Sequence, residues 1–395
     1  MASPFPVGSL GLPLRPTEYS DYTGTTLWVH SELRSFLETT DAGKQFADRA
    51  SDAYETYKAH EKPNFAGGVF PVSQKQFVDW YTNYANQTSE GKASDAVERY
   101  VSSDHFSSVF ALWISGIEVE EGVCLTDEFQ LRSHQDMPLT TDSLKFARDD
   151  WEIGYPWPKC AVAKTIKVEK QSRADGRPFE SEFDHLLDIS RLINLIPGLT
   201  SVPVLQTNTP LAIPEQNLFG GGGLMFPRHP FNENFELFTD DHKSSLEALL
   251  ADWSARSEST KRRLRRSIDR LASAKHHQDI RDRFLDLAIA LEILLLHDNT
   301  NHVQLSLSFR LHGALLLGGD LDTKKANQKM LGELYNYRSA VAHQGTLGKA
   351  KFKEEGENWE TLLAKFEALS TTIIRKLVEV GLPDWNQVRL SGKIE

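Results

Sequence analysis

Two side chains near the C-terminus could together act on a phosphodiester: Arg338 and His343, separated by four residues. A guanidinium can hold phosphate oxygens and offset negative charge as it develops in a reaction. A histidine titrates near neutral pH and can act as a general acid or base. These are the residue types that a site acting on a phosphate would use, and the segments around them decide whether they form one.

The segment around the pair has the spacing of an amphipathic helix. Its stripe at three- and four-residue intervals contains Leu331, Leu334, Tyr335, Arg338, Val341 and Ala342. A lone charge on an apolar stripe is costly, so Arg338 needs a partner. His343 falls in the last turn, where the helix dipole favours a cation, and Gly345 is a typical residue to end the helix.

A carboxylate that could pair with Arg338 lies upstream. Glu292 stands in the strongly apolar run Leu287–Leu296, which predicts a central, largely buried helix. A buried carboxylate requires a cation, and Arg338 and Arg310 are the candidates. In the simpler interpretation, Glu292 only anchors one of these arginines and has no part in turnover.

Three segments in this order and spacing carry a family resemblance: Ile280–Leu296 with Glu292, Ser308–Gly318 with Arg310, and Leu334–Ser339 with Arg338. They resemble the HEPN domains, specifically the ApeA-like branch found in prokaryotic defence proteins. The resemblance covers about residues 275–350 and leaves the N-terminal half unassigned. It implies a metal-independent endoribonuclease that is active across a dimer and leaves a 2′,3′-cyclic phosphate.

In this resemblance Arg338 would be the phosphate clamp and His343 the acid/base, with Glu292, Arg310 and Ser339 in support. The family usually has Asn, Asp or His directly after the arginine, and Ser339 is shorter than any of these. The departure leaves an alternative open. The domain could be catalytically silent, a HEPN module that dimerises and binds RNA or a protein partner, with a salt-bridged arginine and a helix-terminal histidine.

A basic stretch precedes the apolar run. Residues 255–283 contain ten Lys/Arg and four Asp/Glu, a local balance of +6 in a chain whose net charge is −11. The acidic remainder argues against a protein that coats nucleic acid with its whole surface. The stretch predicts either an ordinary solvated helix face or an RNA-binding patch made by Arg262, Arg263, Arg265 and Arg266.

The patterns predict an α+β protein of two parts. Residues 1–235 form a mixed α/β region of unrecognised fold, helical over the first 100 residues, with expected strands at Phe110–Ile114, Gly116–Val119 and Val162–Val168. Residues 236–395 are expected to form an all-α helical bundle, which the resemblance implies is HEPN-like. The segment Val303–Leu311 alternates like a strand, and the family resemblance favours a helix there.

Other chemistries are weakly supported. The histidines at 276, 277, 297, 302 and 312 match no metal-ligand spacing, and no Gly-x-Ser-x-Gly occurs, so we expect neither a metal nor another cofactor. The run Gly220–Gly223 lacks the Lys-Ser/Thr of a phosphate loop and predicts a flexible connector. Two cysteines, no signal peptide and no long apolar run favour a cytoplasmic protein without membrane contact.

The expected partners follow from the resemblance. They are RNA, with tRNA as one candidate, and a second copy of the chain in a homodimer or higher even oligomer. The N-terminal region would bind a trigger of phage origin or restrain the nuclease, which would act as an effector of antiphage, abortive-infection defence.

Overall fold

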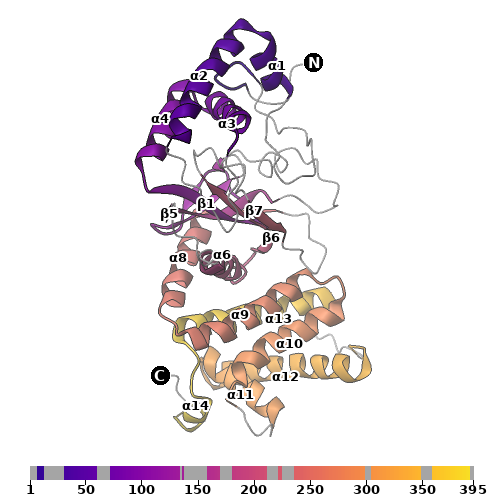
Figure 1. Cartoon of the computed structure of the whole chain (residues 1–395). Coiled ribbons are helices and arrows are strands. Elements are labelled where there is room, and N and C mark those ends of the chain that lie inside the picture. Colours follow the sequence, from indigo (N-terminus) through magenta and orange to yellow (C-terminus); the bar gives the residue numbers. More distant parts are fainter. Residues whose placement is uncertain are drawn as a thin grey trace. The chain divides into compact units, whose positions relative to one another are not determined.

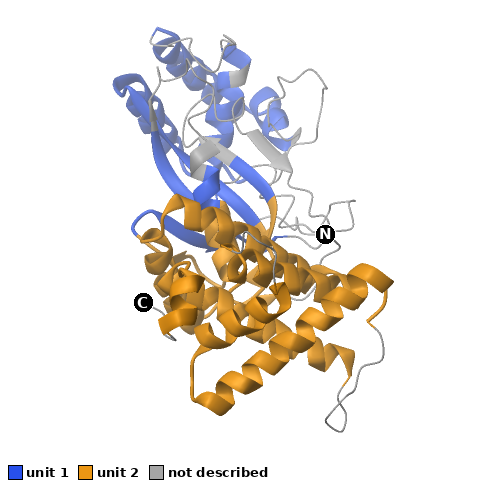
Figure 2. Ribbon diagram, turned by 90° about the horizontal axis from the view of Figure 1, so that it is seen from below, with its two compact units in different colours: residues 1–113, 127–186, 205–225 blue, residues 114–126, 187–204, 226–395 orange. Residues whose placement is uncertain are grey.

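The computed structural model has an α+β architecture, with a sheet in the N-terminal half and helices in the C-terminal half, as predicted (Figure 1). It describes residues 7–12, 31–59, 72–133, 136–137, 158–169, 180–210, 221–224, 235–298, 304–347 and 358–391. The chain divides into two compact units, coloured separately in Figure 2. Unit 1 comprises residues 1–113, 127–186 and 205–225, and unit 2 comprises 114–126, 187–204 and 226–395.

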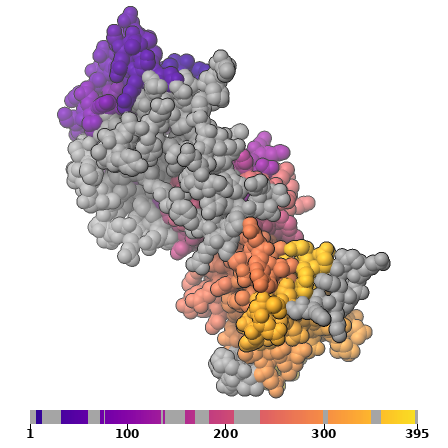
Figure 3. All heavy atoms as spheres, turned by 90° about the vertical axis from the view of Figure 1, so that its right-hand side faces the viewer, coloured from indigo at the N-terminus to yellow at the C-terminus, as the bar shows by residue number. Residues whose placement is uncertain are grey.

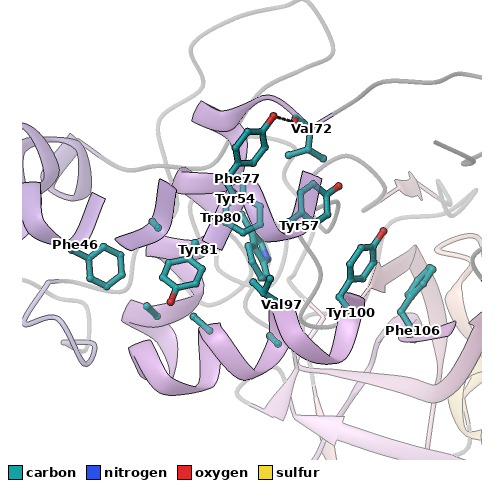
Figure 4. Close-up of a cluster of buried hydrophobic side chains, with 14 residues drawn as sticks. Phe46, Tyr54, Tyr57, Val72, Phe77, Trp80, Tyr81, Val97, Tyr100 and Phe106 are labelled. Carbon is teal, nitrogen blue, oxygen red and sulfur yellow. Dashed lines mark hydrogen bonds between the residues drawn. The ribbon is translucent and has the colours of Figure 1, made fainter. Parts of the chain in front are cut away.

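The first helices of unit 1 confirm the helical prediction for this region. They are α1 (Ser31–Thr39), α2 (Asp41–Lys58), α3 (Gln74–Gln87) and α4 (Glu90–Ser102). Aromatic residues at helical spacing pack their core, including Tyr57, Phe77 and Tyr81, each at most 2% exposed (Figure 4). The ring centroids of Tyr57 and Phe77 lie 5.1 Å apart, so folding buries a large area of aromatic surface at this contact.

One acid is buried in this helical cluster with little compensation. Asp79 of α3 is 5% exposed, and its Oδ2 atom is buried without a hydrogen-bond partner among the described residues. Burial raises the pKa of Asp79 to about 6, while the positive charges of Arg34 and Lys75 oppose the rise. Asp79 therefore destabilises unit 1 when it is ionised.

A six-stranded sheet follows in the order β3-β4-β5-β1-β6-β7. The strands are β1 (His105–Ser115), β3 (Val123–Cys124), β4 (Phe129–Ser133), β5 (Cys160–Glu169), β6 (Val202–Pro210) and β7 (Gly221–Leu224). β4 and β5 pair antiparallel with Leu131 opposite Val162. A separate pair joins β2 (Ile117–Glu118) in parallel to β8 (Glu236–Leu237). The predicted strands are confirmed in β1, β2 and β5.

The glycine run forms a strand, so the prediction of a flexible connector was wrong. Gly221, Gly222 and Gly223 lie in β7, opposite Asn208, Thr207 and Gln206 of β6 in an antiparallel ladder. Backbone hydrogen bonds to a neighbour can hold an extended segment that has no side chains to pack. Sequence patterns based on side chains miss such a strand.

Unit 2 contains the helices that carry the candidate site. The sequence places α6 (Glu180–Ile193) before them, and then α8 (Asp240–Ser254), α9 (Glu258–His276), α10 (Ile280–Leu295), α11 (Leu305–Leu317), α12 (Leu321–Gln344), α13 (Trp359–Val380) and α14 (Trp385–Ser391). Residues 305–311 are helical, which confirms the helical choice for the described part of the ambiguous segment. α10 packs against α9, α12 and α13 and is buried over most of its surface, as its apolar run predicts (Figure 1).

α11 and α12 approach each other closely at two glycines. A Cβ atom built on Gly332 would lie 2.7 Å from Cδ of Arg310, and one on Gly313 would collide with Leu331. The missing side chains leave room for the Arg310 stem and for Leu331. This pair of contacts fixes how α11 lies along the first half of α12.

The last helix, α14, docks through Trp385. This side chain is fully buried, its indole N–H donates to the carbonyl of Leu294 at 3.2 Å, and its ring stacks on His312 with centroids 4.5 Å apart. α13 packs against α8, α9 and α10. On the face in Figure 3, yellow atoms from the C-terminal end of the chain therefore lie beside orange atoms from the helices that precede them in the sequence. Among the helices described, none is long and apolar enough to cross a membrane.

Candidate functional site

α12 positions Arg338 and His343 and ends where the sequence predicts. Asp320 accepts a hydrogen bond from the Thr323 N–H at its start, and Gly345 closes it with φ of 69°. A left-handed residue at this point favours glycine, because other residues are strained there. The predicted stripe is buried at Leu331 and Leu334 but becomes half-buried further along the helix and exposed at Ala342.

Arg338 forms an ion pair with Glu292 of α10. Its Nη2 donates to Glu292 Oε2 at 3.2 Å, and the side chains are 28% and 19% exposed. The guanidinium carbon also lies 5.9 Å from the centre of the Tyr335 ring. Of the remaining nitrogens, Nε is sealed from solvent without a hydrogen bond. Nη1 makes no hydrogen bond with the described residues.

Glu292 is less acidic than an ordinary glutamate. Burial raises the pKa of its carboxyl, and the charge and hydrogen bond of Arg338 oppose this rise without cancelling it. In this half-buried ion pair, the cost of removing the two charges from water is therefore partly offset by their attraction to each other. Removing Arg338 would leave Glu292 with the unfavourable contribution alone.

His343 lies on a different side of α12. It is exposed in the last turn, and no hydrogen bond or ion pair joins it to the described part of the chain. Five residues at about 100° each place His343 about 140° around the helix from Arg338, and Ser339 is only about 40° from His343. Within one copy, the structure brings Arg338 to Glu292 and leaves His343 apart, with half-buried Ser339 on the histidine's side.

Arg310 is not the partner of Glu292. Its Nε donates to the carbonyl of Ser306 at 3.1 Å, one turn earlier on α11, and its stem packs over Gly332. Of the two arginines that the sequence offered to Glu292, the structure joins Arg338 to it. Arg310 instead contributes to the packing of α11 on α12.

Sequence reasoning missed the residues that hold the end of α12. Arg281, in the first turn of α10, donates from Nη1 to the carbonyl of Gly345 at 3.2 Å, and Asp279 holds the same guanidinium. Tyr337 packs against Phe284 and Trp359, with ring centroids 5.3 Å and 5.4 Å away. These contacts anchor the turn that presents His343. The spacing Asp279-x-Arg281 at a helix start was the signal available in the sequence.

The basic stretch forms α9, and one of its four proposed arginines is already bound within the protein. Arg265 donates from Nε and Nη2 to buried Asp188, each at 2.8 Å, and also pairs with Glu258. These hydrogen bonds raise the pKa of Arg265 further, despite its partial burial. Asp188 accepts additional bonds from Trp253 at 3.2 Å and Arg191 at 3.1 Å. Arg265 therefore ties α9 to α6 and is poorly placed to bind RNA.

The other proposed arginines remain available. Arg262, Arg263 and Arg266 are exposed, and none is paired with another described residue. Arg270, one turn further on, is half-exposed but donates to Asp286 at 2.8 Å, and the same carboxylate accepts from His277. Unpaired cations therefore gather on the first half of α9.

Comparison of the chain with family models, curated proteins and solved structures finds no match. In the described ranges, no three His, Cys, Asp or Glu side chains gather in a way that could hold a metal ion. The functional assignment consequently depends on the residues of this chain alone.

Proposed function

We propose that the C-terminal helices form a HEPN-type, metal-independent endoribonuclease that acts as an antiphage, abortive-infection effector in the cytoplasm. The observation that carries this proposal is the ion pair between Arg338 of α12 and Glu292 of α10. Five residues after Arg338, His343 is exposed at the end of α12. This combination supplies a phosphate-binding cation and a proton-transfer group. The ApeA-like resemblance supports the place in defence.

The chemistry needs few groups from the protein. RNA carries its own nucleophile, the 2′-hydroxyl. Its attack on the neighbouring phosphorus gives up a proton, forms the P–O2′ bond and breaks the P–O5′ bond, which leaves a 2′,3′-cyclic phosphate and a 5′-hydroxyl that takes up a proton. His343 would take or give the proton, and Nη1 of Arg338 would hold a phosphate oxygen. Glu292 fixes the guanidinium, so that less freedom is lost when the phosphate binds.

Two copies would complete the site. Arg338 and His343 of one chain point about 140° apart on α12, so His343 of one copy would meet Arg338 of another across a two-fold axis. The shallow burial of α12 supports such an arrangement, because Leu331, Gly332 and Leu334 are its fully buried residues in a helix of 24. A partner helix could cover the half-buried remainder.

The test of the chemistry is cleavage of RNA by the full chain in EDTA. We expect cyclic-phosphate ends, loss of cleavage in His343→Ala, and little change in Gln344→Ala, an exposed neighbour that serves as the matched control. Mixing His343→Ala with Arg338→Ala should restore part of the activity if sites are shared between copies. Chelator-sensitive cleavage, or full activity in His343→Ala, would refute the proposal.

RNA would be gripped by the unpaired arginines of α9. The triple variant Arg262→Gln, Arg263→Gln and Arg266→Gln should weaken binding and flatten its salt dependence, with tRNA as the first substrate to test. A matched triple variant at exposed lysines of unit 1, Lys44, Lys58 and Lys92, changes the net charge equally. Equal losses in both variants would argue against an α9 patch.

A specific observation favours a second candidate, a catalytically silent HEPN module that dimerises and binds RNA or a protein partner. Arg338 is already paired with Glu292, and His343 lies on another side of the helix. The silent module predicts salt-dependent RNA binding without cleavage under any condition. In either case the N-terminal region would receive the trigger, and a growth test of wild type against His343→Ala under phage challenge separates an effector from a binding module.

A further inference from the structure

A cavity of about 600 Å³ lies within unit 2, and none of the residues of the proposed ribonuclease site lines it. One side is a face of α13 with Glu367, Thr371 and Arg375 at four-residue spacing. Pro197, Lys275 and Leu317 contribute to the other walls. The volume is in the range of pockets that hold small organic ligands.

Two of the cations that line the cavity, Lys275 and Lys376, already bind to other groups of the protein. The Lys275 side chain is 7% exposed, and its ammonium donates to the carbonyls of Asn194 at 2.9 Å and Leu199 at 3.0 Å, with Glu367 at 4.0 Å. Lys376 contacts both carboxylate oxygens of Glu379 at 3.1 Å. Two of the three ammonium donors of Lys275 are therefore used, and the nearby carboxylate of Glu367 competes with any ligand for the third.

Arg375 differs from these lysines. Its Nη1 donates to the carbonyl of Leu195 at 3.3 Å, which fixes the guanidinium at the cavity wall. Among the described residues no acid pairs with Arg375, and none forms a hydrogen bond with its Nε or Nη2. Neither nitrogen is among the polar atoms buried without a partner. Thr371 is 7% exposed and lies one turn earlier on the same face, and its hydroxyl makes no hydrogen bond with the described residues. A tethered guanidinium edge and a hydroxyl thus remain unused in the cavity.

We propose that this cavity binds a small phosphate monoester of nucleotide size, with its phosphate on Arg375 and Thr371. A guanidinium edge offers two parallel N–H donors, the geometry that phosphate oxygens accept. The cavity exceeds the volume of a phosphate, and Pro197, Leu316 and Leu317 provide apolar wall for a base. Burial of the base and the bidentate contact would therefore act together.

The proposal is tested by calorimetric or NMR titration of the full chain with AMP, inorganic phosphate and adenosine. AMP should bind saturably, and more tightly than phosphate or adenosine alone. Arg375→Gln should weaken AMP binding by about tenfold or more, and Thr371→Val by several-fold. Lys329→Gln, the matched control, should stay within about twofold, because Lys329 is exposed on α12 and does not line the cavity.

Arg375→Lys keeps a cation and a donor for Leu195 but loses the guanidinium edge, so it should also bind AMP weakly while remaining folded. This variant keeps the test decisive if Arg375→Gln does not fold. Absence of saturable AMP binding, wild-type affinity in Arg375→Lys, or adenosine binding as tight as AMP binding would overturn the proposal. Displacement of AMP by a short RNA of higher affinity would also overturn it, in favour of a strand-binding groove. None of these readouts depends on ribonuclease activity.

Discussion

Substitution of Asp79 by asparagine should stabilise unit 1 at neutral and alkaline pH. The pKa of the folded-state carboxyl is about 6 instead of 3.8 because burial disfavours the charge. At about 1.4 kcal/mol for each pKa unit, ionising Asp79 costs the folded state about 3 kcal/mol. An asparagine side chain has no charge to desolvate but still needs hydrogen bonds, so we expect a gain of about 2–3 kcal/mol at pH 8.

The pH dependence gives the sign of this effect. Below pH 3.8 the carboxyl of Asp79 is protonated in both the folded and the unfolded chain, and its charge costs nothing. As pH rises from 3.8 to about 6 the unfolded state loses its proton first, so folding stability falls. The advantage of Asp79→Asn should therefore be absent near pH 4, grow through this window and level off above it.

Hydrogen exchange at the amides of α3, measured across pH in the full chain, reports on this unit separately from unit 2. Asp95→Asn on α4 is the matched control, because Asp95 is exposed and its substitution should change stability by no more than about 0.5 kcal/mol. An equal gain for Asp79→Asn at pH 4 and pH 8, or none at pH 8, would show that Asp79 is not an uncompensated buried charge.

Three further outcomes are expected from equilibrium unfolding in urea. Arg265→Met should destabilise unit 2 by about 2–3 kcal/mol, because Asp188 loses a bidentate hydrogen-bond partner but keeps its bonds from Trp253 and Arg191. A change near zero would contradict a structural role for Arg265. Arg338→Met should cost about 1–3 kcal/mol and raise the pKa of Glu292, and Glu292→Gln in that background should recover most of the loss; without such recovery, the ion pair is not the cause. Trp385→Ala should cost up to about 3–5 kcal/mol and release α14 to proteolysis, and continued protection of that helix would show that other contacts hold it.

Helical periodicity was sufficient to predict the frame of the candidate site. The end of α12 at Gly345, the central position of α10 and the need of Arg338 for an acid all follow from spacing and burial cost, and the structure confirms them. Glu292 could be named as the partner because a carboxylate in an apolar run has few places to find a cation.

Other features depend on contacts that one sequence does not encode locally. Arg265 belongs to the same charged run as Arg262 and Arg263, and only its distant partner Asp188 in α6 separates it from them. The glycine strand β7 has no side-chain pattern, since its register is set by backbone pairing with β6. Likewise, the sequence predicts an exposed position for Asp79 on α3, and its burial results from packing with other helices.

The contact between Gly332 and the stem of Arg310 has a consequence for sequence evolution. A methyl group at position 332 would lie 2.7 Å from the arginine's Cδ, so the two helices cannot accept it while the long side chain stays in place. Substitutions at positions 332 and 310 therefore depend on each other. A related chain with a larger residue at 332 should have a shorter one at 310. Gly313 and Leu331 impose the same condition about one turn further along α11. In an alignment of related chains, these two pairs should covary more strongly than the exposed positions around them.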